Sequence, residues 1–407
     1  MAFTRPAFNC PPEHGAGDRL SFSPWPYFSD EEIAAAVEVL RSGKVNYWTG
    51  DECKRFEQEY AAHVGAKYAI AAANGTLTLE LALLARGIGP GDEVVVTPRS
   101  YVASVSCVIN CGATPIFADV DQDSGNITAS SISQVISDRT RAVIPVHLAG
   151  WPCDMDPIME LASQHGLFVL EDCAQAHGAV YRKRPVGSLG HVGSFSFCQD
   201  KILTTGGEGG MVLTDDEDLW KKMWSLKEHG KSYDACFKRE WPPGFKWLHE
   251  SFGSNCRMTE MQAAIGRVIL KKLPHWVHTR KANALQLREA LSKFPSVRAP
   301  EAPADLENAY YKYYCYVNPT KLKHGWSRDR LMTSIAKQGI PCFSGSCSEI
   351  YLEAAFVNSN LQPSNRLPVA KELGETSLMF LVHPTLRTDE IARVCAVIEA
   401  VFHEATA

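Results

Sequence analysis

The chain has 407 residues, of which 45% are hydrophobic and 21% are charged. This composition is typical of a globular protein and excludes a disordered or fibrous chain, and the length favours one large domain with a smaller one. The net charge of −5 at pH 7 argues against a general nucleic-acid binder, which would carry a basic excess. Residues 1–20 contain no apolar core of a secretion signal, and no stretch is apolar for long enough to span a bilayer. We therefore expect a soluble, cytoplasmic protein.

The 13 cysteines are scattered singly, and none forms a Cys-x-x-Cys pair. Most lie in apolar surroundings, as Cys107 and Cys111 do, which is typical of buried, reduced thiols. A metal site built from Cys153, Cys173 and some of the histidines is conceivable, but the spacing matches no zinc pattern. We predict no metal site.

The first predicted helix begins at Ser29, which forms a capping box with Glu32, and ends at Gly43. A second helix is predicted over residues 54–63. From Tyr68 onward, short apolar runs alternate with longer amphipathic stretches. The runs predict strands over residues 68–73, 93–97, 115–120, 142–147 and 167–171, and the stretches between them predict helices over residues 76–86, 101–111 and 155–165. This alternation of apolar strands and helices indicates a mostly parallel sheet that is covered on both faces.

Two more strands are predicted over residues 193–198 and 210–214, with a glycine-rich loop between them. The helices predicted after them are over residues 216–228, 259–270 and 276–292, and the prolines that then interrupt the helical pattern are Pro295, Pro300 and Pro303. The remaining pattern predicts a strand over 311–317 and helices over 328–338 and 388–402. We therefore divide the chain into a large α/β domain over residues 1–295, which includes the N-terminal helical segment, and a small α+β domain over residues 296–407.

Four short segments fall where a covered parallel sheet places its ligands, beyond the carboxyl ends of the strands. Asn74-Gly75-Thr76 begins a helix whose N–H groups could bind a phosphate, although such turns are more often structural. Asp172 ends one strand and Lys201 follows another. A carboxylate can hold a pyridine nitrogen protonated and a lysine can react with an aldehyde, but a lone acid or lysine here would ordinarily be a helix cap or a surface residue. The loop Thr204–Gly210 contains enough glycine for close approach to a ligand, or for a tight hairpin.

In their order along the chain, these segments resemble the DegT/StrS family of sugar aminotransferases, which have pyridoxal-phosphate (PLP) fold type I. The resemblance runs from about Phe22 to the C-terminus. It rests on four stretches, which are Leu83–Val94, Glu171–Gly178, Ser194–Gly210 and Arg257–Ala264. It implies an α/β fold like that of aspartate aminotransferase, with a mostly parallel sheet of the seven-stranded type flanked by helices and a smaller α+β domain at the C-terminus.

The resemblance also implies a role for each matching residue. Lys201 corresponds to the lysine that binds PLP covalently, and Asp172 to the aspartate that pairs with the pyridine nitrogen, so both are predicted to be catalytic. The other predicted cofactor contacts are Gln175 beside the ring near its phenolic oxygen, Tyr101 stacked on the ring, Gly75, Thr76 and Ser196 at the phosphate, and Asn255, which reaches the phosphate from the neighbouring subunit. The family typically forms dimers with shared active sites, so we expect a homodimer.

The implied activity is transfer of an amino group from L-glutamate to a keto-deoxy sugar nucleotide, during biosynthesis of an amino sugar for a surface polysaccharide or a glycosylated metabolite. A few relatives carry histidine in place of Lys201 and dehydrate a deoxysugar, so the lysine favours aminotransfer. Two alternatives remain. The chain could be a non-catalytic regulatory homologue, or it could run another fold type I reaction, either sugar dehydration or desulfuration through Cys342 or Cys347. Neither nucleic acid nor a membrane is expected as a partner.

Two positions depart from the family's pattern. Cys198-Gln199-Asp200 replaces the Gly-Asn type of sequence before the lysine, and Arg99 stands where an apolar or aromatic residue is commoner. Outside the matched motifs, His383 and Tyr351 are candidate contacts for the sugar or the neighbouring subunit, although a histidine before a proline is more often packed. The loop that contains Lys246, Trp247 and His249 could meet the nucleotide.

Overall fold

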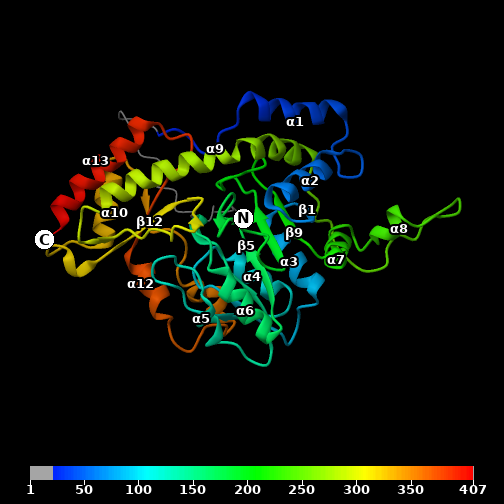
Figure 1. Cartoon of the computed structure of the whole chain (residues 1–407), viewed down its shortest axis with the longest axis horizontal. Coiled ribbons are helices and arrows are strands. Elements are labelled where there is room, and N and C mark those ends of the chain that lie inside the picture. The colour runs from blue at the N-terminus through cyan, green and yellow to red at the C-terminus, as the bar shows by residue number, and fades with distance from the viewer. Residues whose placement is uncertain (1–21, 407) are drawn as a thin grey trace, which may run out of the picture.

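The computed structural model describes residues 22–406, so the expectation about a secretion signal in residues 1–20 lies outside the described part. The N-terminal helix α1 (Asp30–Ser42) packs along α9 (Glu260–Leu291), as Figure 1 shows. Ser29 and Glu32 form the predicted capping box, and Gly43 ends the helix with φ 68°. Glycine adopts this left-handed conformation without steric cost, so the predicted bounds of the first helix are confirmed.

The large sheet has seven strands in the order β1-β9-β8-β5-β4-β2-β3. Neighbours from β8 to β3 run parallel, whereas β9 runs antiparallel to both β1 and β8. All the strands predicted for the first half of the chain are present, with ends that differ by a few residues. The bounds are β1 (Tyr68–Ala72), β2 (Glu93–Val96), β3 (Thr114–Phe117), β4 (Thr140–Ile144), β5 (Phe168–Asp172), β8 (Val192–Ser196) and β9 (Gly210–Thr214).

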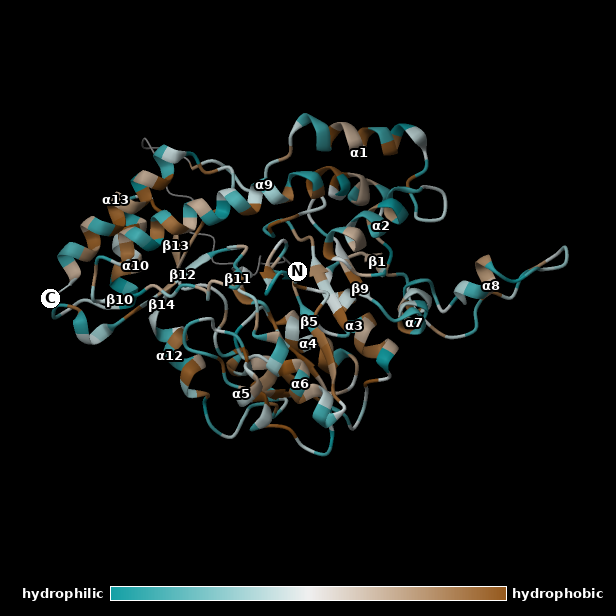
Figure 2. Cartoon of the chain, viewed as in Figure 1, coloured by the Kyte–Doolittle hydropathy of each residue, from teal (hydrophilic) through white to brown (hydrophobic). Residues whose placement is uncertain are grey.

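Both faces of this sheet are buried. Successive strand residues point to opposite faces, so Val95 and Val169 belong to one hydrophobic core while Val94 and Leu170 belong to the other. The central strands are mainly hydrophobic and the surrounding helices carry mixed faces in Figure 2. The covering helices are α2 (Glu52–Val64), α5 (Ala129–Ser133) and α6 (Met155–His165) on one face, and α3 (Gly75–Arg86), α4 (Ala103–Asn110) and α7 (Glu217–Lys227) on the other. The predicted doubly covered parallel sheet is thereby confirmed.

The prediction of two separate helices over 259–270 and 276–292 is wrong, because α9 is one helix of 32 residues. Pro274 lies inside it and removes one backbone hydrogen bond. The helix packs against α1 and α2 and against α13 (Thr388–Ala405). Burial of its residues in two cores, such as Ile269 and Leu287, outweighs the local cost of the proline.

The C-terminal part contains a four-stranded antiparallel sheet in the order β10-β12-β14-β13. Together with α10 (Arg328–Lys337) and α13 it encloses a third hydrophobic core, which matches the predicted α+β composition. A division at residues 295/296 stays a prediction. The bounds of the sheet are β10 (Val297–Arg298), β12 (Tyr313–Val317), β13 (Cys342–Phe343) and β14 (Ser377–Phe380). The short elements are β6 (Val180–Tyr181), β7 (Arg184–Pro185), β11 (Leu306–Glu307), α11 (Ala354–Asn358) and α12 (Pro368–Thr376).

A thin extension leaves the body of the molecule at α8 (Tyr233–Phe237) and the loop that follows it (Figure 1). The large side chains of this loop are exposed, with Phe245 at 74%, Trp247 at 70% and Phe252 at 98%. Among residues 22–406, no helix combines the length and the apolar character that crossing a bilayer requires.

Candidate active site

Asp172 is the last residue of the central strand β5, so it lies at the C-terminal end of the parallel strands. It is buried, and its carboxylate accepts hydrogen bonds from Ser104 Oγ at 2.7 Å and from the backbone N–H of Ala174 at 3.1 Å. Within the described part of the chain no cation lies within ion-pair distance of it. A buried carboxylate usually has a cationic partner. Asp172 therefore retains the capacity to accept a hydrogen bond from a protonated ring nitrogen.

Gln175 is tied to two segments that are distant in the sequence. Its Oε1 accepts a hydrogen bond of 2.9 Å from the N–H of Ala149, whose own carbonyl accepts one of 2.8 Å from the N–H of Tyr311. Ala149 has φ 56°, a strained conformation for a residue with a side chain. These contacts bring the loop after β4 and the residues just before β12 to the C-terminal end of the parallel strands, where Asp172 lies.

The N-terminus of α3 lies against the end of β8. The Asn74 side chain caps the helix by accepting from the N–H of Leu77 at 3.0 Å, and the N–H groups of Gly75 and Thr76 make no hydrogen bond within the described residues. A Cβ atom on Gly75 would lie 2.5 Å from Cβ of Ser196, so the close approach requires glycine. Free N–H groups, the helix dipole and the Ser196 hydroxyl together suit a phosphate.

Lys201 lies in the loop after β8, and its Nζ lies 5.0 Å from the centroid of the Tyr311 ring. Its carbonyl accepts a hydrogen bond of 3.2 Å from Trp25 Nε1. The neighbouring Asp200 accepts a hydrogen bond from the Tyr311 hydroxyl. Burial alone would raise the pKa of Asp200, but the Lys201 charge and the Tyr311 hydroxyl outweigh burial and hold the pKa below its usual value. Tyr311 thus connects the loop of Lys201 with that of Ala149 and Gln175.

Two predicted residues lie at the surface. Tyr101 precedes α4 and is 64% exposed, and the hydroxyl groups of Ser100 and Ser104 connect its loop to Asp172. Asn255 is exposed, and its Oδ1 accepts a hydrogen bond of 3.0 Å from Arg257. Six of the predicted residues therefore lie at the C-terminal ends of the strands of the large sheet. They are Asp172, Gln175, Lys201, Gly75, Thr76 and Ser196. Tyr101 and Asn255 are exposed beside them.

The sequence reasoning missed the residues that connect this site, which are Ser104, Ala149, Arg280, Tyr311 and Lys312. No local pattern marks them, although the run Tyr310–Tyr314 is unusually aromatic. Arg99, noted as a departure from the family, is fully buried; its Nη1 donates to Ser348 Oγ at 2.7 Å and its guanidinium lies near the rings of Tyr314 and Tyr316. It therefore joins the large sheet to the C-terminal part.

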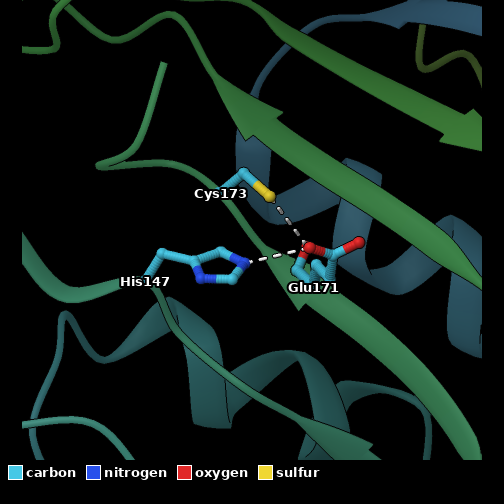
Figure 3. Close-up of side chains that lie close together, drawn as sticks. All are labelled: His147, Glu171 and Cys173. Carbon is cyan, nitrogen blue, oxygen red and sulfur yellow. Dashed lines mark hydrogen bonds and ion pairs between the residues drawn. The ribbon is translucent and has the colours of Figure 1, made fainter. Parts of the chain in front are cut away.

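Figure 3 shows His147, Glu171 and Cys173 close together, with ligand atoms within 4.8 Å of one another. The spacing could suit a metal ion, but the carboxylate of Glu171 already accepts four hydrogen bonds. The donors are the N–H groups of Gly187, Leu189 and Gly190 and Nε2 of His147. His147 Nδ1 in turn accepts from the N–H of Cys153 at 2.9 Å. Because a carboxylate has about four acceptor positions, the cluster holds the fold together without a metal.

The candidates outside the motifs are mostly packed. Tyr351 is buried and its hydroxyl donates to Glu349 at 2.6 Å, and His383 is buried with its ring stacked on Trp25. Burial raises the pKa of Cys342 to about 12, and partial desolvation raises the pKa of Cys347, which lies at the surface. A desulfurase needs a cysteine that ionises readily, so the two thiols do not favour that alternative.

Comparisons with known proteins agree with this geometry. Residues 26–399 match the DegT/DnrJ/EryC1/StrS aminotransferase family. The spore coat polysaccharide biosynthesis protein SpsC of Bacillus subtilis is 35% identical over 94% of this chain and 97% of its own length. A UDP-N-acetyl-3-dehydro-alpha-D-glucosamine 3-aminotransferase of Acidithiobacillus ferrooxidans is 35% identical over 95% of this chain and 96% of its own. The crystal structure of an aminotransferase from Psychrobacter cryohalolentis is 57% identical, with a TM-score of 0.93, and covers 94% of this chain and 99% of that one.

The match spans most of the chain, and the family consists of PLP-dependent enzymes of fold type I. The mixed α/β architecture described above is that fold. The match to an aminotransferase family and to relatives named as aminotransferases shows an enzyme rather than the non-catalytic homologue that the sequence left open. The chain belongs to the DegT/DnrJ/EryC1/StrS aminotransferase family and is a PLP-dependent sugar aminotransferase.

Proposed function

We propose that this enzyme transfers an amino group from L-glutamate to a keto-deoxy sugar nucleotide, in the biosynthesis of an amino sugar for a surface polysaccharide or a glycosylated metabolite. The observation that carries the proposal is that contacts through Ala149 and Tyr311 connect Gln175 with the loop of Lys201, while Asp172 is hydrogen-bonded through its backbone to His147, in the same loop as Ala149. The names of two relatives support the substrate class, since one is a UDP-sugar 3-aminotransferase and the other serves spore coat polysaccharide biosynthesis.

The described residues fit PLP at both of its ends. The free N–H groups of Gly75 and Thr76 and the Ser196 hydroxyl are suited to its phosphate, and the carboxylate of Asp172 is suited to its ring nitrogen. Gln175 and Tyr101 are assigned to the ring. Bound PLP supplies an electron sink for the pair of electrons left when the donor's α-carbon loses a proton.

The chain's own residues carry out the proton transfers in this scheme. Asp172 holds a proton on the ring nitrogen, because an ionised carboxylate stabilises the positive charge there. The amine of Lys201, once released from the cofactor, takes the proton from the α-carbon of the donor. Asp200 and Tyr311 lie beside this lysine and fix the loop that carries it. The same groups then act in reverse on the keto sugar.

The visible absorption spectrum of the purified protein, before and after L-glutamate is added, tests the proposal. We expect a band of lysine-bound PLP that disappears with glutamate and returns when a keto-sugar nucleotide is added. A Lys201→Ala variant lacks the band, whereas a Lys337→Ala variant, altered at an exposed lysine of α10, behaves as the wild type. A wild-type band that glutamate leaves unchanged contradicts the proposed donor reaction.

We propose further that the enzyme works as a homodimer in which Asn255 completes the phosphate site of the partner. The extension at α8 supports this, because exposed aromatic side chains such as Phe245, Trp247 and Phe252 are typical of a surface that another chain covers. Mixing Lys201→Ala with Asn255→Ala subunits tests it. A mixed dimer regains one complete site if Asn255 acts across subunits, and regains none if Asn255 acts within its own chain.

A further inference from the structure

Three cationic side chains surround one tyrosine next to the site. The Nζ atoms of Lys201 and Lys312 lie 5.0 and 4.7 Å from the centroid of the Tyr311 ring. The guanidinium of Arg280, on α9, donates to the Tyr311 carbonyl at 3.2 Å. Asp200, which accepts a hydrogen bond from the Tyr311 hydroxyl, is a carboxylate whose negative charge raises the pKa of Lys312.

The carboxylate of Asp200 balances only part of the positive charge of these three side chains. Within residues 22–406, neither Lys201 nor Lys312 has an ion-pair partner within 4.0 Å, and Nε and Nη2 of the buried Arg280 lack hydrogen-bond acceptors. Burial, together with Arg280 and Lys201, lowers the pKa of Lys312 to about 8 against the opposing effect of Asp200. His383 adds no charge, since burial lowers its pKa to about 3. Buried charge is costly unless it is paired, so the cluster is prepared for an anionic ligand.

We propose that Lys312 binds the α-carboxylate of the amino donor, which makes Lys312 a residue that selects α-amino acids over simple amines. This inference rests on the proposed function. The donor's nitrogen takes the place of the Lys201 amine during the reaction, and its α-carboxylate is only two bonds from that nitrogen. The side-chain carboxylate of glutamate and the phosphates of a sugar nucleotide lie several bonds further from the reacting atoms.

Arg280 has a supporting part in this arrangement. Its side chain is fully buried between Trp25 and Tyr311, with the guanidinium 4.8 Å from the Trp25 ring, so it acts through its charge rather than by touching the donor. Although burial lowers its pKa, the side chain of Lys312 keeps part of its surface exposed, as that of Lys201 does. Lys312 is therefore the member of the cluster, besides Lys201, that a ligand can reach.

A Lys312→Gln variant tests the proposal, with Lys337→Gln as the matched loss of an exposed lysine charge. PLP-loaded proteins are titrated with L-glutamate, L-glutamine and the α-amide of L-glutamic acid while the visible absorption is followed. In Lys312→Gln, the half-saturating concentrations of glutamate and glutamine should rise ~10- to 100-fold, as expected for loss of a charged hydrogen bond. The wild type should discriminate against the α-amide and the variant should not. The half-saturating keto-sugar nucleotide concentration should stay unchanged.

Equilibrium binding of glutarate, which carries carboxylates but no amine, gives a second readout that needs no reaction. Calorimetry should show its dissociation constant rising ~10-fold in Lys312→Gln and not in Lys337→Gln, with unfolding temperatures of both variants close to that of the wild type. Equal behaviour of the two variants toward glutamate and glutarate overturns the proposal, as does an effect confined to the sugar nucleotide. If the wild type itself ignores glutamate and glutamine, the proposed function fails, and glutarate binding decides the role of Lys312 by itself.

Discussion

Glu171 and Asp172 are consecutive carboxylates at the end of β5, yet their surroundings differ completely. Glu171 faces the core that α2 and α6 cover, where three backbone N–H groups and His147 fill its acceptor positions. Asp172 faces the side of α4, where it receives one hydrogen bond from Ser104 and one from Ala174. Both are buried, so exposure does not distinguish them.

The number of donors that each carboxylate already receives separates a structural acid from one that is prepared for a ligand. A buried carboxylate whose acceptor positions are all filled stabilises the loop that supplies the donors. A buried carboxylate that has unfilled acceptor positions and no cationic partner can still accept hydrogen bonds from a ligand. The same reasoning applies to Lys312 and His177. Among residues 22–406 the lysine amine has no ion-pair partner, while the histidine has a hydrogen-bond partner on each ring nitrogen.

Of the substitutions that test this comparison, Asp172→Asn should lower the rate with glutamate the most. The amide keeps the size of the side chain and can still bond to Ser104 and Ala174, but it cannot stabilise a protonated ring nitrogen. We expect the rate with glutamate to fall on the order of 10²- to 10³-fold, with a small change in unfolding temperature. Single-turnover absorption measurements check the rate. A variant that loses stability but keeps its rate would contradict the assignment.

Glu171→Gln should show the opposite pattern. The amide nitrogen of glutamine must face at least one of the backbone N–H groups in the loop that Gly187 begins, because every acceptor position of Glu171 meets a donor. We expect a loss of about 1–3 kcal/mol in the free energy of unfolding and a rate within a few-fold of the wild type at low temperature. Urea denaturation and the same single-turnover assay measure the two quantities. A large loss of rate without a loss of stability would show that Glu171 serves the chemistry directly.

His177, a buried group with both ring nitrogens hydrogen-bonded, makes the stability of the fold depend on pH. Its Nδ1 pairs with the Tyr60 hydroxyl and its Nε2 donates to the Ser196 carbonyl, and burial lowers its pKa from 6.5 to about 3. Between these values the unfolded chain binds a proton that the folded chain does not, so stability falls as the pH drops below 6.5. From pH 6.5 to 5 this one histidine should cost about 2 kcal/mol.

Denaturation curves at several pH values test the effect of His177. A His177→Gln variant cannot bind the proton, so its stability should depend less steeply on pH between 6.5 and 5, whatever its absolute stability. The same slope in variant and wild type would mean that His177 is protonated in the folded protein or that other groups dominate.

The alternation of apolar strands and helices was enough to predict the parallel sheet, because buried parallel strands must be apolar along their whole length. The same alternation predicted that Asp172 and Lys201 follow the C-terminal ends of two strands, because the strand ends are fixed once the strands are identified. The continuity of α9 across Pro274 was not predictable, because it depends on packing against α1, α2 and α13 rather than on local propensity.

The connecting residues of the site were hidden for a similar reason. Tyr311 and Lys312 lie more than a hundred residues from Lys201 in the sequence, and only the folding of β12 against the loop of Ala149 brings them together. The filling of all the acceptor positions of Glu171 was not predictable either. Three of its donors are backbone N–H groups of a loop whose residues carry no distinctive side chain. Side-chain chemistry is visible in a sequence, whereas backbone donors are not.

The smallest change in rate is expected from the two serine hydroxyl groups that are hydrogen-bonded in series to Asp172. Ser104 donates directly to its carboxylate, and Ser100 bonds to Ser104 at 2.9 Å. Ser104→Ala removes one of two donors to Asp172, so the rate with glutamate should fall about 10-fold, as expected for one hydrogen bond to a charged group. Ser100→Ala leaves that bond in place and should change the rate by less than about 3-fold. The same single-turnover assay compares the two variants, and equal losses in both would mean that the loop before α4 acts by positioning Tyr101 rather than through Asp172.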